Sequence, residues 1–479
     1  MGQAFWTGLQ LTAVVLVVVV VGLPITQIAF GAGNLAISVN GLISLSFFIG
    51  YAIITGILKL LVAFDLPVQL MAWQFLFLAV LAFILFYVYA SKHKKKFRTL
   101  SEMKPTWDYC IALLIVILVS GIGLIIVGSF HYRGYFWWDT LYYGTHAEFL
   151  KTIPFSSLSE MVMKQPYLAV TSGILQGAHR ISRGVFEAFL ASVLNVDGAS
   201  TIGLSSVFSV VLLFSALTYS TENFRMNRYT RMLACCLCSV LPNTILTGLE
   251  GFISVSYFTA FTVLSIKLFK DGFMHPHCFK TIVTALIVSA AFSTLLDGLY
   301  VCIALSIIAY VGLMITKQVR LKDGVHFILL WTVAFLSNLP YLGKFLDELG
   351  LNMSKQALNS LYPFAFSPQV LNWALWGKLG LIENSGVHFI YTMISITLII
   401  TGVFALIYAF VHDHLLEGML SSALLFVPLL FVAQYDNYQY AFYKVFTLIF
   451  PLVGFGSWYF VQLISGNSCS VSRLNVDSG

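Results

Sequence analysis

Charged residues are scarce in this chain. Only 10% of its 479 residues are Asp, Glu, Lys or Arg, and 59% are hydrophobic, whereas soluble domains carry about 25% charged residues. No polar block is long enough to form a soluble domain, and no glycine-rich phosphate loop is present. Repeated apolar runs of about 20 residues can each cross a bilayer, so the chain is predicted to be a polytopic helical membrane protein.

No disulfide framework is expected, because none of the seven cysteines falls in a loop that we assign to the outer face. The cluster Cys235-Cys236-x-Cys238 lies in an apolar helix without a nearby histidine or acid. Core packing is therefore favoured over a metal site for this cluster. The net charge of +6 is scattered over loops, so no nucleic-acid partner is expected.

Basic residues mark one side of the membrane. The loop Lys92-His-Lys94-Lys95-Lys96-Phe-Arg98 is cytoplasmic by the positive-inside rule, and the inner loops that follow it, up to residue 322, are also basic. This alternation places the N-terminus outside. About thirteen spans are expected, over residues 8–30, 37–64, 67–90, 108–130, 199–220, 232–249, 251–269, 281–296, 299–316, 325–341, 387–411, 416–434 and 443–464.

The spans divide the chain into consecutive parts, and the fold class is all-α, a polytopic transmembrane helical bundle. Interfacial helices are expected in the outer loop, over about 139–152 and 166–195. The parts are four N-terminal transmembrane helices (1–130), the outer loop (131–198), further transmembrane helices (199–341), a second outer loop (342–386), C-terminal transmembrane helices (387–464) and a cytoplasmic tail (465–479).

The outer loop 131–198 holds the densest group of reactive side chains. Aromatic rings settle at the membrane–water boundary, where a partly desolvated carboxylate can accept a proton near neutral pH. Residues i and i+7 of a helix share a face, so Asp139 and His146 are expected to point into one cavity. The candidate residues in this stretch are Arg133, Asp139, Tyr142, Tyr143, His146 and Glu148.

A structural role for Asp139 is the alternative. The run Asp139-Thr-Leu-Tyr142 fits the start of a helix, where an aspartate caps free backbone N–H groups. Both roles are compatible, because a capping aspartate at the membrane surface can still face a substrate.

The stretch resembles the GT-C superfamily of polytopic glycosyltransferases. The run Asp139-x-x-Tyr142-Tyr143 followed by His146 is similar to the aspartate-containing outer loop of bacterial members. Pro24 in the first helix, serines 44 and 46 in the second and the basic loop after the third also resemble such members. The likeness covers most of the chain in architecture and about twenty residues in motif.

The resemblance implies a sugar donor linked to a polyprenyl phosphate, a glycan or lipid acceptor, and Asp139 as the catalytic base on the extracytoplasmic face of the cell membrane. The sequence departs from the usual pattern in lacking an Asp-x-Asp pair. This departure leaves open whether a divalent metal, Mg²⁺ or Mn²⁺, takes part.

Cations near the outer interface are candidates for binding the lipid phosphate. Arg180 and Arg183 present the forked donors that suit phosphate, and contact with ordinary lipid headgroups is the alternative. Lys59, near the end of the second span, is expected to snorkel to the outer surface.

The last outer segment, just before the final span, contains tyrosine rings that suit contact with a sugar. It also contains a lysine, which is a further candidate for binding phosphate. An aromatic belt with a snorkelling lysine has the same composition. Asp297 ends a span at the same face and is a further candidate. The substrate-binding candidates of the last outer segment are Asp436, Tyr438, Tyr440 and Lys444.

Three functions therefore stay under consideration. The first is a glycosyltransferase of the GT-C type. A transporter or flippase of a lipid-linked or polar solute would also need a wet, charged cavity, but would usually place ionisable groups near mid-membrane. A polymerase or ligase of surface polysaccharide would concentrate basic residues in its large outer loops, and loop 342–386 holds as many acids as lysines.

Overall fold

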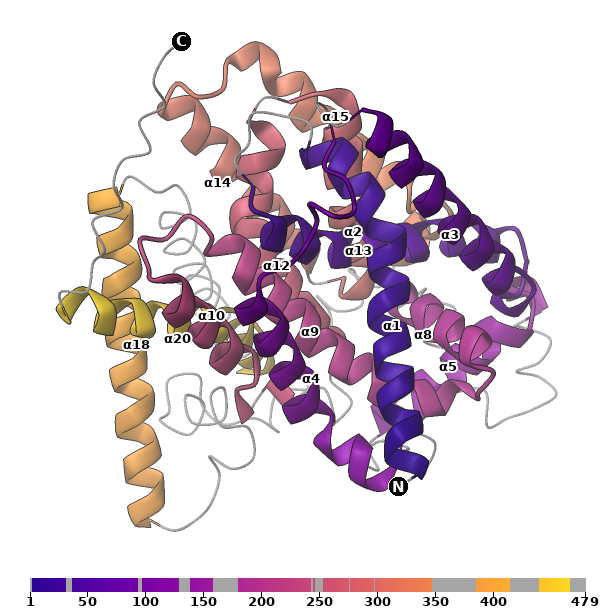
Figure 1. The fold of residues 1–479 in the computed structure, drawn as a ribbon, viewed down its shortest axis with the longest axis horizontal. Helices are drawn as coiled ribbons and strands as arrows, with labels where there is room; N and C mark the ends of the chain where they lie inside the picture. Colours follow the sequence, from indigo (N-terminus) through magenta and orange to yellow (C-terminus); the bar gives the residue numbers. More distant parts are fainter. Residues whose placement is uncertain are drawn as a thin grey trace.

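A computed structural model describes residues 2–31, 37–93, 97–128, 138–157, 180–242, 244–245, 253–274, 276–296, 298–346, 385–413 and 439–465. Within these ranges the chain is helical, with no strand, which confirms the all-α prediction. The longer helices of the first half are α1 (Gly2–Thr26), α2 (Val39–Ala63), α3 (Val68–Lys92), α4 (Trp107–Val127), α5 (Trp138–Thr152), α8 (Ile181–Leu194) and α9 (Ile202–Ser220). They are followed by α10 (Arg228–Ser239), α12 (Ile253–Phe273), α13 (Cys278–Thr294), α14 (Gly298–Ile315), α15 (Gly324–Leu336), α18 (Ser385–Asp413) and α20 (Gln439–Ile464) (Figure 1).

Eight helices in the described ranges are long and apolar enough to cross a membrane, and a bent pair at 321–346 makes up to nine. They support a multi-pass membrane protein, but the count of about thirteen spans is not confirmed. The first part of the predicted span at 232–249 belongs to the 12-residue helix α10, which ends at Ser239, and residues 243 and 246–249 lie outside the described residues. Pro242 follows Ser239 closely, and a proline disfavours helical geometry in the residue before it. The predicted span at 416–434 lies outside the described residues.

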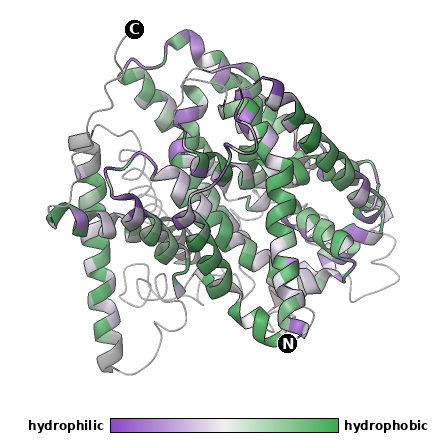
Figure 2. Cartoon of the chain, in the orientation of Figure 1, coloured by the Kyte–Doolittle hydropathy of each residue, from purple (hydrophilic) through white to green (hydrophobic). Residues whose placement is uncertain are grey.

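The extent of burial distinguishes the central helices from the peripheral ones. Helices α9 and α12 are buried along almost their whole length, and α9 packs against α2, α4 and α12. The long helices α3 and α4 leave most of their apolar side chains exposed, and Figure 2 shows them mainly green. A hydrophobic exterior of this kind is expected of helices that face lipid. At the left edge of Figure 1, α18 and α20 cross and pack on each other.

Two glycines bring α1 and α2 into close contact. A Cβ atom at Gly22 of α1 would overlap the carbonyl oxygen of Ser46, and one at Gly50 of α2 would overlap that of Val18. Backbone-to-backbone packing through small residues is a common way for membrane helices to associate, because lipid supplies no hydrophobic drive between them.

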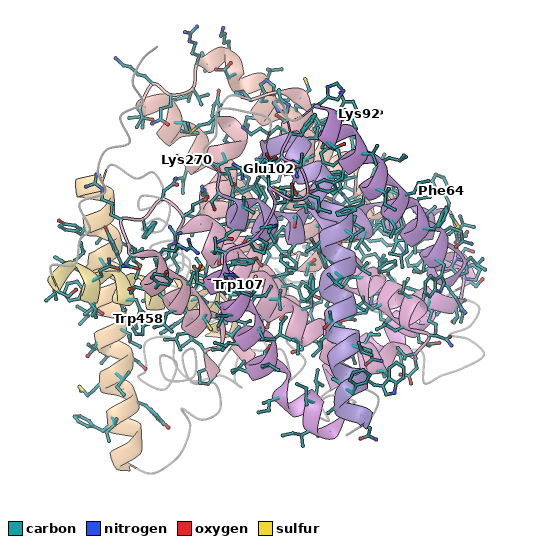
Figure 3. The ribbon with its side chains drawn as sticks, in the orientation of Figure 1. Phe64, Lys92, Glu102, Trp107, Lys270 and Trp458 are labelled. Carbon is teal, nitrogen blue, oxygen red and sulfur yellow. The ribbon has the colours of Figure 1, made fainter. Side chains whose placement is uncertain are left out.

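The two ends of the bundle are named here by the residues and helices that they carry. One end, called here the basic end, carries Lys92, Arg98 and Lys270, and Figure 3 shows Lys92 and Lys270 in the upper half of the view. The opposite end, called here the α5 end, carries α5, α8 and the last turns of α2 and α13. The sequence prediction assigned the basic end to the cytoplasm.

A hydrogen-bonded carboxylate joins three helices at the basic end. Glu222, just after α9, accepts a hydrogen bond from the backbone N–H of Ser38 (2.6 Å), which caps α2, and from Lys267 Nζ of α12 (2.8 Å). Burial alone would raise the pKa of Glu222, but the Lys267 ammonium and the Ser38 N–H outweigh it and hold that pKa below its usual value.

This depressed pKa predicts acid sensitivity. The stabilising contribution of Glu222 is fully present above its unfolded pKa of about 4.3 and is lost as the pH falls through the lower folded value. We expect the difference in thermal unfolding midpoint between the wild type and Glu222→Gln to be large near neutral pH and to shrink below about pH 4. A difference that stays constant down to acidic pH would contradict this assignment.

Helix α8 occupies a different place from the one expected. The region 166–195 is predicted to lie along the interface, yet every side chain of α8 from Ile181 to Ser192 is buried, and α8 packs against α2, α3, α5 and α13. Its charged residues Arg183 and Glu187 pair with each other inside the bundle, so α8 needs no polar face toward the membrane surface. The helix α5, by contrast, begins where the sequence predicts.

Candidate functional site

Helix α5 carries most of the candidate residues that were predicted in the outer loop. Its first turn contains Asp139, and Tyr143, His146 and Glu148 follow on the same helix. The predicted helix over both Asp139 and His146 is therefore confirmed, which places these two positions on one face. Tyr143 and His146 are each only 1% exposed, so this face of α5 is packed into the bundle.

The partner of that face is helix α8. The guanidinium carbon of Arg183 lies 3.1 Å from the centre of the Tyr143 ring, and that of Arg180 lies 5.2 Å from it. The imidazole of His146 packs on Gly184, where an added Cβ would come within 2.6 Å of the ring. Glycine at this position therefore allows the two helices to approach, and the cation–π contacts orient them.

Arg183 is held inside the protein. Its Nε lies 3.1 Å from Glu187 Oε1, one turn further along α8, and its Nη1 donates to Ser254 Oγ of α12 at 3.2 Å. Both members of the ion pair are buried. The sequence-based expectation placed Arg183 beside a lipid phosphate, but Arg183 already has a buried carboxylate partner. Arg180, at the start of α8 and only partly buried, is the more accessible cation.

The backbone at Arg180 has an unusual conformation. Arg180 has φ 57° and ψ 34°, in the left-handed region, immediately before α8 begins. Its carbonyl accepts hydrogen bonds from the N–H groups of Arg183 (3.1 Å) and Gly184 (3.2 Å). A non-glycine residue in this region costs free energy, and such residues are concentrated at functional sites.

Glu148 binds the protein backbone. Its Oε2 accepts a hydrogen bond from the N–H of Gly198 (2.7 Å), and Lys151 Nζ lies 3.5 Å from its Oε1. Lys151 also donates to the carbonyl of Val196 at 2.8 Å. Glu148 and Lys151 together attach α5 to the turn that precedes α9, so the geometry gives Glu148 a positioning contact.

Several predicted site residues fall outside what the structure describes. Arg133, Asp297, Asp436 and Tyr438 lie outside the described residues. Four others are placed only by their helix, because their side chains are not described: Asp139 and Tyr142 on α5, and Tyr440 and Lys444 on α20. Among the described residues, no three His, Cys, Asp or Glu side chains form a group that could hold a metal ion.

The prediction for Lys59 is wrong. Its side chain is 1% exposed and does not reach the surface. Instead, Lys59 Nζ donates to Asn338 Oδ1 at 2.7 Å and to Ser293 Oγ at 3.0 Å. The Lys59 ammonium therefore forms hydrogen bonds inside the bundle and does not extend to the membrane surface. The polar partners come from residues 234 and 279 positions further along the chain.

Sequence reasoning also missed Glu187 and Asn338. Glu187 lies in an apolar run, and an ionisable residue there is itself a signal of function or pairing. Asn338 precedes Leu339-Pro340 within an apolar run, and a proline there marks a break in the helix. The structure shows that break as a bend of 59° between 321–336 and 339–346.

Comparisons with known proteins give no relative: no family model, no curated protein and no solved structure matches this chain.

Proposed function

We propose that this protein is a membrane glycosyltransferase that uses a sugar linked to a polyprenyl phosphate. The observation that carries the proposal is the packing of α5 on α8. This packing brings the helix of Asp139 against the helix of Arg180 and Arg183. A carboxylate position and cation positions on adjoining helices are what transfer from a sugar phosphate to a hydroxyl requires.

The proposed reaction divides the work between the two helices. Asp139 takes the proton from the acceptor hydroxyl as that oxygen forms a bond to the anomeric carbon of the sugar. The bond from the anomeric carbon to the phosphate oxygen breaks, and the lipid phosphate leaves with its negative charge. Arg180 stabilises that charge, and Lys444 of α20 is the second proposed phosphate contact. His146 and Tyr143 hold the two helices together.

The proposal predicts that Asp139→Asn abolishes sugar transfer. An amide cannot accept the proton, and the loss of a general base typically lowers the rate by about 100- to 10,000-fold. The measurement is the cell-surface glycan profile of the native cell with the chromosomal gene replaced by the variant. Thr140→Ser, on the next residue of the same helix, is the matched control.

Protein level and membrane insertion are measured in parallel. Loss of one sugar in Asp139→Asn at a normal protein level, with an unchanged Thr140→Ser profile, supports the proposal and identifies the glycan. A wild-type glycan in Asp139→Asn would remove Asp139 as the base and with it the proposed reaction.

A transporter of a polar or lipid-linked solute is a second candidate, and one observation favours it. Ionisable groups lie inside the bundle, in the Arg183–Glu187 pair and in Lys59. Charged groups in the interior of membrane proteins commonly line substrate or ion pathways. Uptake of a labelled solute by vesicles that hold only this protein would distinguish transport from transfer, because a glycosyltransferase leaves the vesicle lumen unlabelled.

A further inference from the structure

The lysine that the sequence placed at the surface is the centre of a buried polar network. Lys59 lies one turn before the end of α2, Ser293 lies in the last turn of α13, and Asn338 lies just after α15. Ser182 of α8 joins the network through Ser293, with 2.6 Å between the two hydroxyl oxygens. The network therefore joins α2, α13, α8 and the segment just after α15 at the α5 end.

The hydrogen-bond directions in this network are determined by its backbone contacts. Asn338 Nδ2 lies 2.9 Å from the carbonyl oxygen of Ala334, which can only accept, so the amide nitrogen must face that carbonyl. Asn338 Oδ1 then faces Lys59. The Ser293 hydroxyl donates to the carbonyl of Ser289 at 2.6 Å, so its lone pairs are also available to Lys59. Asn338 Oδ1 and Ser293 Oγ therefore both present lone pairs to the Lys59 ammonium.

Among the residues that the structure describes, no carboxylate pairs with the Lys59 ammonium, although that ammonium is buried. Helices α13 and α15 both end near the Lys59 ammonium, and the C-terminal end of a helix carries a partial negative charge of about half an elementary charge. Neutral oxygens and helix C-termini are the ligands that broken membrane helices offer to small monovalent cations.

We propose that Ser293, Asn338 and the C-terminal ends of α13 and α15 form a monovalent-cation site, and that the Lys59 ammonium is its covalently attached occupant. The oxygen ligands lie 2.7 and 3.0 Å from Lys59 Nζ, a spacing that suits an ammonium or potassium ion. The attached cation fastens the bend after α15 to α2 and, through Ser182, to α8. This inference does not depend on the proposed glycosyltransferase activity.

Two further hydrogen bonds attach the segment around Asn338 to neighbouring helices. Tyr341, three residues after Asn338 and only 1% exposed, donates from its hydroxyl to the carbonyl of Lys59 at 2.8 Å. Ser337 Oγ donates to Ser289 Oγ at 2.7 Å. The segment around the bend is thus bound to α2 and α13 on both sides of Asn338.

The test removes the Lys59 ammonium by substitution and supplies a free monovalent cation in its place. The purified full-length Lys59→Ala variant in nanodiscs is unfolded thermally in KCl, NH₄Cl, LiCl and choline chloride at equal ionic strength. We expect potassium or ammonium to raise its unfolding midpoint by about 2 °C or more over choline, because a ligand that binds only the native state stabilises it. The wild type should show no difference among these salts.

Lys344→Ala is the matched control. Lys344 lies at the same end of the bundle, with its Nζ 4.4 Å from the centre of the Phe155 ring, so its removal should produce no preference among cations. If Lys59→Ala shows the same midpoint in all four salts, the site does not bind a cation and the proposal is overturned.

A milder set of variants covers the case in which Lys59→Ala does not fold. The variants Lys59→Met, Ser293→Ala and their combination form a double-mutant cycle in the unfolding midpoint. Because both act on one site, we expect the double variant to lose clearly less than the sum of the two single losses. Additive losses, or a Lys59→Met variant as stable as the wild type, would overturn the proposal.

Discussion

Glu187→Gln should destabilise the protein strongly. The substitution leaves the Arg183 guanidinium in the interior without its carboxylate, although both side chains are almost completely buried. Removing one partner of a buried ion pair typically costs about 3–5 kcal/mol, because the remaining charge is uncompensated. The measurement is the free energy of unfolding, or the thermal midpoint, of the purified variant in detergent or nanodiscs.

The same variant should also loosen α5. Arg183 stacks on Tyr143, so a displaced Arg183 removes a contact that orients the helix of Asp139. We therefore expect faster hydrogen exchange of the α5 backbone in Glu187→Gln. Such a change would link the ion pair to the position of the proposed base.

A more exposed ion pair provides the comparison. Arg228 pairs with Asp108 between α10 and α4, and their side chains are 48% and 9% exposed, against 1% and 0% for Arg183 and Glu187. Because solvent screens the exposed guanidinium, Arg228→Gln should cost clearly less than Glu187→Gln. If Glu187→Gln and Arg228→Gln lose the same amount, the Arg183–Glu187 pair is not the buried, unscreened interaction described above.

Gly50→Ala should separate α1 from α2. The added Cβ would overlap the carbonyl oxygen of Val18, and a backbone atom cannot move aside as a flexible side chain can. Overpacking of this kind typically costs about 1–3 kcal/mol. Gly22→Ala, which would overlap the carbonyl of Ser46, should have a similar effect, and the thermal midpoint measures both.

Gly56→Ala is the matched control on the same helix. Nothing lies within 4 Å of a Cβ at Gly56, and alanine favours a helix over glycine by about 1 kcal/mol. We therefore expect Gly56→Ala to be neutral or stabilising. A stable Gly50→Ala variant would show that α1 and α2 are not held at the separation that the structure gives.

Local composition was enough to predict the helical class. Long apolar runs such as 39–63 and 202–220 must satisfy their backbone groups internally, and only a helix does so within one segment. The start of α5 near Asp139 was also predictable, because an aspartate followed by helix-compatible residues is a local signal. Both inferences depend on residues close together in the chain.

The number of crossings was less predictable. Hydropathy alone predicted a span at 232–249, but helix α10 in that region ends at Ser239. The run 181–194 has a composition that allowed an interfacial helix, and it is buried among other helices instead. Hydropathy measures the preference of a segment for an apolar environment, and protein neighbours satisfy that preference as well as lipid does.

The sequence by itself determined that the chain is an all-helical, multi-pass membrane protein with its densest group of acids, rings and histidine near residue 139. Only the tertiary structure decided the partners of its buried polar groups: Glu187 and Ser254 for Arg183, and Ser293 and Asn338 for Lys59. The reason is physical. Apolar burial has no direction and depends on local composition, whereas a hydrogen bond needs one atom within about 3 Å of another. Which distant residue supplies that atom depends on how the helices pack.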